Sequence, residues 1–129
     1  MNYNVKFGRR NKIIDIPSSK SMAHRFLVCS ALAKKRNLLF CDRISRDISA
    51  TISALNSSGA KIDFLDDECI SIDSNLDIKS GLRHLHCGES GTTFRFLLPV
   101  AAALGFDAVF HLDGRLSKRP MTTDRKNVV

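Results

Sequence analysis

Residues 87–105 form a loop of small residues that runs into an apolar segment and ends at a glycine. Glycines near its start let the backbone turn tightly and approach a ligand without an intervening Cβ. Ser90 or Thr92 can cap a helix there, and the first N–H groups of that helix form a seat for an anion. Arg95, one turn after Gly91, can face the same seat. The stretch therefore predicts either an anion-binding helix start or a capped core helix with one exposed arginine.

A second helix start of this kind lies at residues 17–25, where serines precede a long apolar-periodic run. This pattern predicts a helix that ends near residues 33–35, with lysines in its last turn. Lys20, Ser21 and Arg25 cluster at its start, and the last two, four residues apart, share a face. Together they can bind a carboxylate or phosphate in several ways at once. The alternative is a plain serine cap with solvated cations.

Residues 113–121 form a third polar stretch, which begins with Asp-Gly and carries four charged residues. Asp-Gly marks a turn. Pro120 holds the residue before it, Arg119, in an extended conformation. Taken alone, the stretch is typical of a solvated basic loop.

The rest of the sequence predicts alternating helices and strands. A further helix is expected at 46–55, and strands are expected at 5–7, 12–16, 38–41, 61–65, 69–73, 76–78, 82–86 and 108–112. The acidic residues 66–68 indicate a hairpin tip. This order predicts an α/β (α+β) fold in which one repeat of roughly 60 to 70 residues is followed by part of a second.

The charge balance favours anionic partners. Lysine and arginine total 20 against 13 acidic residues, a net charge of +7. Because the cations are dispersed and the chain has no Trp and one Tyr, small anions are favoured over nucleic acid, which stays the weaker alternative. No run of about 18 apolar residues predicts a membrane span. The start of the chain lacks the apolar core of a signal peptide, so we expect a cytoplasmic protein.

The cysteines and histidines give little sign of a metal site. The four cysteines include no C-x-x-C pair, so free buried thiols are expected rather than zinc or disulfides. His84 and His86 share one side of an expected strand, but no third ligand lies near them in the sequence, so we expect no metal. His24 is expected beside the first cationic cluster or on the surface.

The three polar stretches together resemble one enzyme family. Residues 18–25 are similar to the P-G-S-K-S-x-x-x-R segment of the 5-enolpyruvylshikimate-3-phosphate synthase family. Residues 87–95 resemble its G-N-A-G-T-x-x-R loop, and residues 113–121 its G-D-x-S-L-x-x-R-P-M loop. The motifs follow in the family's order at similar spacing. A sister family acting on UDP-N-acetylglucosamine carries Asn after the Lys, so Ser21 and Arg25 favour the shikimate branch.

The resemblance implies a transferase of aromatic amino acid biosynthesis without metal or organic cofactor. It would move the carboxyvinyl group of phosphoenolpyruvate to the 5-hydroxyl of shikimate 3-phosphate and release phosphate. By position, shikimate 3-phosphate would be bound by Lys20, Ser21 and Arg25, and phosphoenolpyruvate by Lys20, Gly91 and Arg119. Arg95 and Glu89 would support the site, and Lys20 is the first candidate for a catalytic contribution.

The sequence also departs from the family pattern. Ser18 stands where the family has Gly, and Glu89 stands where Asn is common. A carboxylate near a phosphate site would need a cationic partner such as Arg119.

The family's enzymes are much longer and have two domains built from βαβαββ repeats, of which this chain supplies about one and a half. We expect N-terminal strands at 1–17 that cross to the other domain, a partial substrate-binding domain at 18–121 and a divergent tail at 122–129. The family's acid–base carboxylate would lie in the part not present. We therefore expect the chain alone to be inactive and its uncovered repeat faces to favour self-association. The alternative is a non-catalytic module that binds small anions.

Overall fold

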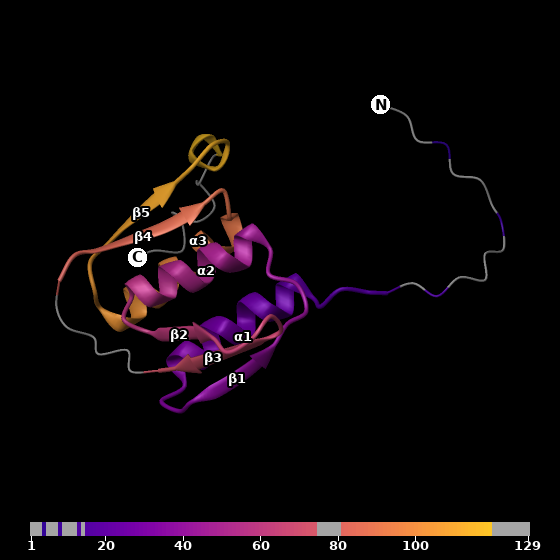
Figure 1. Cartoon of the computed structure of the whole chain (residues 1–129). Helices are drawn as coiled ribbons and strands as arrows, with labels where there is room; N and C mark the ends of the chain where they lie inside the picture. The colour runs from indigo at the N-terminus through magenta and orange to yellow at the C-terminus, as the bar shows by residue number, and fades with distance from the viewer. Residues whose placement is uncertain (1–3, 5–7, 9–12, 14, 75–80, 120–129) are drawn as a thin grey trace.

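The computed structural model describes residues 15–74 and 81–119, together with Asn4, Gly8 and Ile13. In these residues the helices are α1 (Lys20–Leu32), α2 (Arg46–Ser57) and α3 (Gly91–Leu104). The strands are β1 (Asn37–Phe40), β2 (Lys61–Phe64), β3 (Cys69–Asp73), β4 (Arg83–Gly88) and β5 (Ala108–Leu112), and a short 3₁₀ turn, η1, covers Leu116–Lys118. Figure 1 shows the helices as a layer between two small sheets.

The first sheet is antiparallel, with strand order β1-β3-β2. Its β2–β3 hairpin turns at the expected acidic tip, where Asp66 Oδ1 accepts a hydrogen bond of 2.8 Å from the Glu68 amide. Ile70 and Ile72 of the central strand are fully buried, whereas Phe40 of the edge strand β1 is 72% exposed. The sheet therefore packs one face on the helices and leaves apolar side chains on its edge strand uncovered.

The second sheet pairs β4 with β5 in parallel, and α3 is the crossover between them. Parallel pairing brings the carboxyl ends of both strands to one edge. There the Asp113 amide donates a hydrogen bond of 2.8 Å to the Gly88 carbonyl. The glycine-rich loop after β4 and the basic loop after β5 consequently lie side by side (Figure 1).

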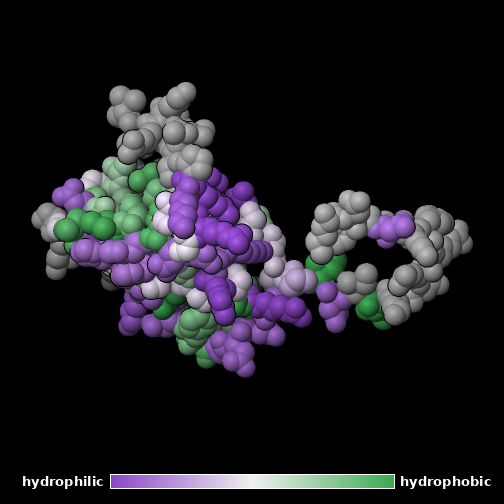
Figure 2. Space-filling view, turned by 90° about the horizontal axis from the view of Figure 1, so that it is seen from above, coloured by the Kyte–Doolittle hydropathy of each residue, from purple (hydrophilic) through white to green (hydrophobic). Residues whose placement is uncertain are grey.

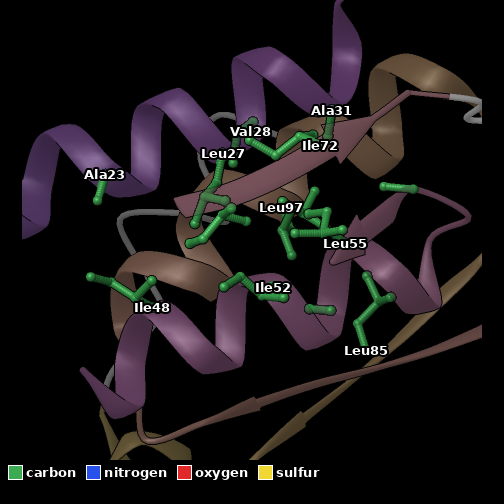
Figure 3. Packing of buried hydrophobic residues seen from close by; sticks show 14 of the residues in the cluster. Ala23, Leu27, Val28, Ala31, Ile48, Ile52, Leu55, Ile72, Leu85 and Leu97 are labelled. Atoms are coloured by element: carbon green, nitrogen blue, oxygen red, sulfur yellow. The ribbon is translucent and has the colours of Figure 1, made fainter. Parts of the chain in front are cut away.

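The core lies where the three helices meet the two sheets. Figure 3 shows side chains of α1, α2 and α3 converging on one another, with Ile72 of β3 and Leu85 of β4 pointing into the same cluster. The largest fully buried apolar side chains are Leu27, Ile48, Leu55, Ile70, Ile72, Leu85 and Leu97. One continuous core therefore holds the helix starts in fixed relation.

Most predicted elements in the described residues are confirmed within one or two residues, and 69–73 and 108–112 are matched exactly. The predicted last turn of α1 is wrong: the helix ends at Leu32, so the following lysines lie beyond it. The predicted strands 5–7 and 76–78 and the tail 122–129 lie outside the described residues, as do residues 12 and 14 of the predicted strand 12–16. Ile13, Asp15 and Ile16, in the same predicted strand, are not in a strand.

The surface is mixed in character. Figure 2 shows hydrophobic patches among hydrophilic side chains on the face seen from above. Large apolar side chains that are more than half exposed include Leu38, Phe64 and Leu82. None of the helices in residues 15–74 and 81–119 has the length and apolar character needed to cross a membrane.

All four cysteines are free; Cys29 is exposed, whereas Cys41, Cys69 and Cys87 are buried. Burial raises the pKa of the Cys87 thiol to about 11, so this thiol stays protonated at neutral pH. We expect a water-soluble disulfide reagent to modify Cys29 in the native chain and Cys87 only after unfolding. Mass spectrometry of labelled peptides tests this. Modification of Cys87 as fast as that of Cys29 would contradict its buried place.

Candidate anion-binding site

The start of α1 is held by its own cap and by a loop from elsewhere in the chain. Ser19 is the N-cap, and its Oγ accepts a hydrogen bond of 3.4 Å from the Met22 amide. The Ser18 amide donates to Asp42 Oδ1 at 2.9 Å. Hydrogen bonds from Ser18 lower the pKa of Asp42, so the carboxylate that receives them is ionised at neutral pH. The first turn of α1 is therefore anchored at its entry.

The three predicted residues at this helix start lie together. Arg25 Nη1 donates to Ser21 Oγ at 2.6 Å and to the Ser21 carbonyl at 3.4 Å, which confirms their shared face. Lys20 forms an ion pair with Asp47 in the first turn of α2. The Lys20 side chain is still 51% exposed. Because an ammonium has three donors, Lys20 can hold Asp47 and an incoming anion together.

Asp47 is a site residue that sequence reasoning missed. Ser45 caps α2 through a 3.3 Å hydrogen bond from the Ile48 amide, and this places Asp47 at the positive end of the helix. A serine followed by an acidic residue is a signal for a helix start. It gives no sign that this carboxylate meets a lysine 27 residues away.

The glycine-rich loop ends in a helix capped by Ser90, not by Thr92. Ser90 Oγ accepts a hydrogen bond of 3.2 Å from the Thr93 amide. Gly88 has a φ of +56°, a conformation that side-chain-bearing residues rarely adopt. Arg95 lies exposed on α3, one turn after Gly91. The first N–H groups of α3 thus lie at the loop, as the sequence predicts.

The basic loop after β5 lies against this helix start. A Cβ atom added to Gly91 would lie 3.4 Å from Leu116 Cδ1 and 3.9 Å from Arg119 Nη1. Arg119 is extended, with φ −73° and ψ 135°, as expected for a residue before proline. The structure therefore brings together the two positions, Gly91 and Arg119, that the sequence predicts for one anion.

Glu89 joins the two loops in a way the sequence does not predict. Its Oε1 accepts a hydrogen bond of 3.1 Å from the Arg115 amide. A backbone N–H group is thus its partner in the described residues, where the guanidinium of Arg119 was expected. Gly114, with φ +52°, gives the carboxylate room, since a Cβ there would overlap it. We call this Glu89–Arg115 hydrogen bond the loop latch.

A pocket of about 380 Å³ opens beside these groups. Its charged lining consists of Arg46, Asp47, Glu89 and Asp113, and it is completed by Ala50, Cys87, Gly88 and Ser90. Three carboxylates against one guanidinium would repel a phosphate. The predicted cations Lys20, Arg25 and Arg119 lie outside this lining, so the residues predicted to bind an anion do not line the pocket.

The paired histidines of β4 meet a third one on β5. His84 Nδ1 lies 2.9 Å from His111 Nε2, and the ring of His86 stacks on His111 with 4.3 Å between centroids. The parallel register explains this, because His86 pairs with His111. Within the part of the chain that the structure describes, no three His, Cys, Asp or Glu side chains are arranged to hold a metal ion.

His24 lies beside the first cationic cluster, which is one of the two expected positions, and it is buried, so the other alternative, a surface position, does not hold. Its Nδ1 lies 2.8 Å from Thr51 Oγ1 on α2. Burial, with a smaller contribution from the charge of Lys20, lowers the pKa of His24, so the imidazole is neutral at physiological pH.

A Gly91→Ala substitution is expected to weaken binding of inorganic phosphate about tenfold, the loss of one charge-assisted contact. The fold should tolerate it, since 3.4 Å to Leu116 is an ordinary contact. The methyl group would, however, stand between the start of α3 and the guanidinium of Arg119. An NMR titration measures the affinity, and an unchanged melting temperature is the control. Unaltered affinity would exclude Gly91 from the seat.

Fold and site together define an α/β protein of the βαβαββ repeat type in which cationic side chains and helix N–H groups gather at two helix starts and a basic loop. Comparison with known families gives a specific assignment. The sequence profile described as EPSP synthase (3-phosphoshikimate 1-carboxyvinyltransferase) matches residues 6–125. The chain belongs to this family.

Individual relatives agree with this assignment. The chain is 42% identical over 134 residues to 3-phosphoshikimate 1-carboxyvinyltransferase of Clostridium beijerinckii, covering 95% of this chain and 29% of that protein. It is 40% identical over 131 residues to the one of Clostridioides difficile, covering 89% and 30%. A solved EPSP synthase from Acinetobacter baumannii superposes with a TM-score of 0.76 at 29% identity, covering 88% of this chain and 26% of that one. The chain therefore spans 26–30% of the length of these relatives.

Proposed function

We propose that this chain supplies the first substrate-binding part of an EPSP synthase. That enzyme transfers the carboxyvinyl group of phosphoenolpyruvate to the 5-hydroxyl of shikimate 3-phosphate and releases phosphate. Family membership over residues 6–125 and the cationic groups gathered at two helix starts support the proposal. The observation that carries it is the proximity of Gly91 to Arg119, since a Cβ added to Gly91 would lie 3.9 Å from Arg119 Nη1 and the two residues belong to separate family motifs.

The proposal assigns the two substrates to two neighbouring seats. In the proposal, the α1 seat, made of Lys20, Ser21 and Arg25, binds shikimate 3-phosphate. A second seat, made of Gly91 and Arg119 and here called the α3 seat, binds phosphoenolpyruvate, with Lys20 reaching both molecules. Each substrate carries a phosphate and a carboxylate, so several fixed cations are needed.

These groups also fit the reaction. Addition of the hydroxyl to phosphoenolpyruvate gives a tetrahedral intermediate that keeps the phosphate and carboxylate charges close together. Cations and helix N–H groups that are already in place stabilise such charge without reorganising during the reaction. The described residues therefore act in the proposal by binding and orienting, and Lys20 is the residue assigned to both substrates.

We expect the chain alone to bind without measurable turnover, since it spans 26–30% of the length of its relatives. The test is an NMR titration of the chain with shikimate 3-phosphate and then phosphoenolpyruvate, followed by an assay for released phosphate. Amide shifts should be confined to Lys20, Ser21, Arg25 and the Gly91 loop. An Arg25→Gln variant should bind shikimate 3-phosphate at least tenfold more weakly, about the loss of one charge-assisted contact.

The matched control is Lys61→Gln, which removes an exposed cation from β2. It should leave both affinities unchanged. Equal losses of affinity in the Arg25 and Lys61 variants would mean that binding depends only on net charge. If the parent chain gave a well-dispersed spectrum but no amide shifts on titration, binding by this chain would be contradicted. Binding without turnover here, and also when the chain is combined with the remainder of a full-length relative, would favour a non-catalytic anion-binding module. Robust turnover by the chain alone would contradict the expected inactivity.

The proposal includes two further expectations. Self-association is supported by exposed apolar side chains such as Phe40 and Phe64, and sedimentation at increasing concentration tests it. A cytoplasmic place of action is supported by four free cysteines, which fit a reducing compartment. A monomer at every concentration would contradict the first expectation, and secretion of the tagged protein would contradict the second.

A further inference from the structure

Four buried polar side chains form a continuous chain beneath the two seats. His24 Nδ1 lies 2.8 Å from Thr51 Oγ1, which lies 2.7 Å from Thr93 Oγ1. Thr93 Oγ1 donates to Ser90 Oγ at 2.7 Å. None of the four residues is more than 2% exposed. We call this set the buried polar chain; its members come from α1, α2, α3 and the cap of α3.

The buried polar chain ends at both proposed seats. His24 follows Lys20 by one turn of α1. At the other end, Ser90 caps α3 and directly precedes Gly91. In the middle, the Asp47 carbonyl lies 3.3 Å from Thr51 Oγ1 and 3.4 Å from Thr93 Oγ1, while its carboxylate holds Lys20. Hydrogen bonds thus connect the starts of all three helices.

Burial alone does not explain these hydroxyl groups. A valine has nearly the shape of threonine and needs no partner in the core, whereas a buried hydroxyl must be paired to avoid a penalty. What the hydroxyl groups add is direction: each hydrogen bond is satisfied over a narrow range of distances and angles. Such a network favours one arrangement of the three helices over others with similar apolar packing.

The imidazole takes part as a neutral group. His24 Nε2 is buried, and no group among the described residues forms a hydrogen bond with it. A proton on that nitrogen would be a buried donor with no acceptor, so the favoured tautomer carries its proton on Nδ1 and donates to Thr51. Thr51 can then donate onward to Thr93 or to the Asp47 carbonyl, and Thr93 to Ser90. In this arrangement the donors of His24 Nδ1, Thr51 and Thr93 are all used.

We propose that Thr51 and Thr93, with His24, are positioning residues that set the distance between the α1 and α3 seats for a pair of small phosphorylated carboxylates. The inference rests on the proposed function for its ligands. None of the three side chains is assigned a contact with substrate. They act through Lys20 and Asp47 at one seat and through Ser90 and Gly91 at the other.

The experiment separates the effect of side-chain shape at Thr51 from the effect of its hydroxyl group. Thr51→Val keeps the volume and removes the hydroxyl, whereas Thr51→Ser keeps the hydroxyl and leaves a methyl-sized gap. We expect the Val variant to melt below the parent, because His24 Nδ1 and Thr93 Oγ1 lose a hydrogen-bond partner. It should also bind phosphoenolpyruvate about tenfold more weakly in the presence of shikimate 3-phosphate. The Ser variant should melt lower and keep its affinity within about twofold. The same pair of substitutions at Thr93 should repeat this pattern.

The control is Ile52→Val, a shortened buried side chain next to Thr51 that lies outside the buried polar chain. It should lower the melting temperature and leave affinity unchanged. If affinity instead follows melting temperature across all these variants, the hydroxyl groups only support the fold and the proposal is overturned.

A measurement without ligand separates this inference from the proposed function. In Thr51→Val, the amide signals of both Lys20 and Gly91 should shift and the ¹⁵N signals of His24 should change, whereas Ile52→Val should leave them in place. Failure of the parent chain to bind either substrate, together with these shifts, would reject the proposed ligands but keep the coupling between the seats. Undisturbed signals at Gly91 in Thr51→Val would reject the coupling itself.

Discussion

Replacing Gly114 by alanine is expected to destabilise the chain by about 2 kcal/mol and to weaken phosphate binding at least tenfold. Gly114 has a φ of +52°, and an added Cβ would overlap the Glu89 carboxylate, with only 2.7 Å to Glu89 Cδ. Glu89 would have to swing away and release the Arg115 amide, which breaks the loop latch. Since Arg119 follows in the same loop, its guanidinium would lose its place over Gly91.

Urea unfolding and a phosphate titration measure the two effects. Glu89→Ala is the matched variant, because it removes the loop latch without straining the backbone at Gly114. The double variant tells whether both substitutions act through the latch. With the latch already broken by Gly114→Ala, adding Glu89→Ala should cost little further stability. Strictly additive losses would mean that the two residues act independently and that the overlap is relieved in another way.

Local structure is the part of this fold that its sequence predicts well. Helix α3 begins after a serine and ends at Gly105, which has the left-handed φ of +71° typical of a helix cap. In strand β3 the β-branched residues Ile70 and Ile72 alternate with polar ones, and the strand follows the acidic turn at 66–68. These signals act within a few residues, so no knowledge of tertiary contacts is needed. The shared face of Ser21 and Arg25 is predictable for the same reason, since helix geometry sets it.

Contacts between residues that are far apart in the sequence could not be predicted. The Lys20–Asp47 ion pair joins residues 27 apart, and the Thr51–Thr93 hydrogen bond joins residues 42 apart. Whether they meet depends on how three helices pack, which no local pattern specifies. The expectation for Glu89 failed for a related reason. Charge alone suggested a cation as its partner, but the parallel pairing of β4 and β5 places a backbone amide there instead.

Replacing Leu85 by alanine is expected to cost about 2 to 5 kcal/mol, the range for removing a fully buried leucine from a core. Leu85 lies in β4 with no exposed surface and points into the cluster formed with α2 (Figure 3). In the described residues, β4 pairs only with β5, so this pair of strands depends on its packing against α2. Leu82→Ala, three residues earlier and 60% exposed in the parent chain, is the control and should change stability by less than about 0.5 kcal/mol.

The Leu85→Ala substitution should destabilise one part of the chain more than the rest. Hydrogen exchange should show β4, β5 and the start of α3 opening first in Leu85→Ala, because the first sheet keeps its own buried isoleucines. Phosphoenolpyruvate binding at the α3 seat should then weaken more than shikimate 3-phosphate binding at the α1 seat. Uniform opening of the chain, with both affinities lost together, would instead mean that the seats belong to one cooperative unit. In that case, anchoring of β4 through Leu85 is required for both seats.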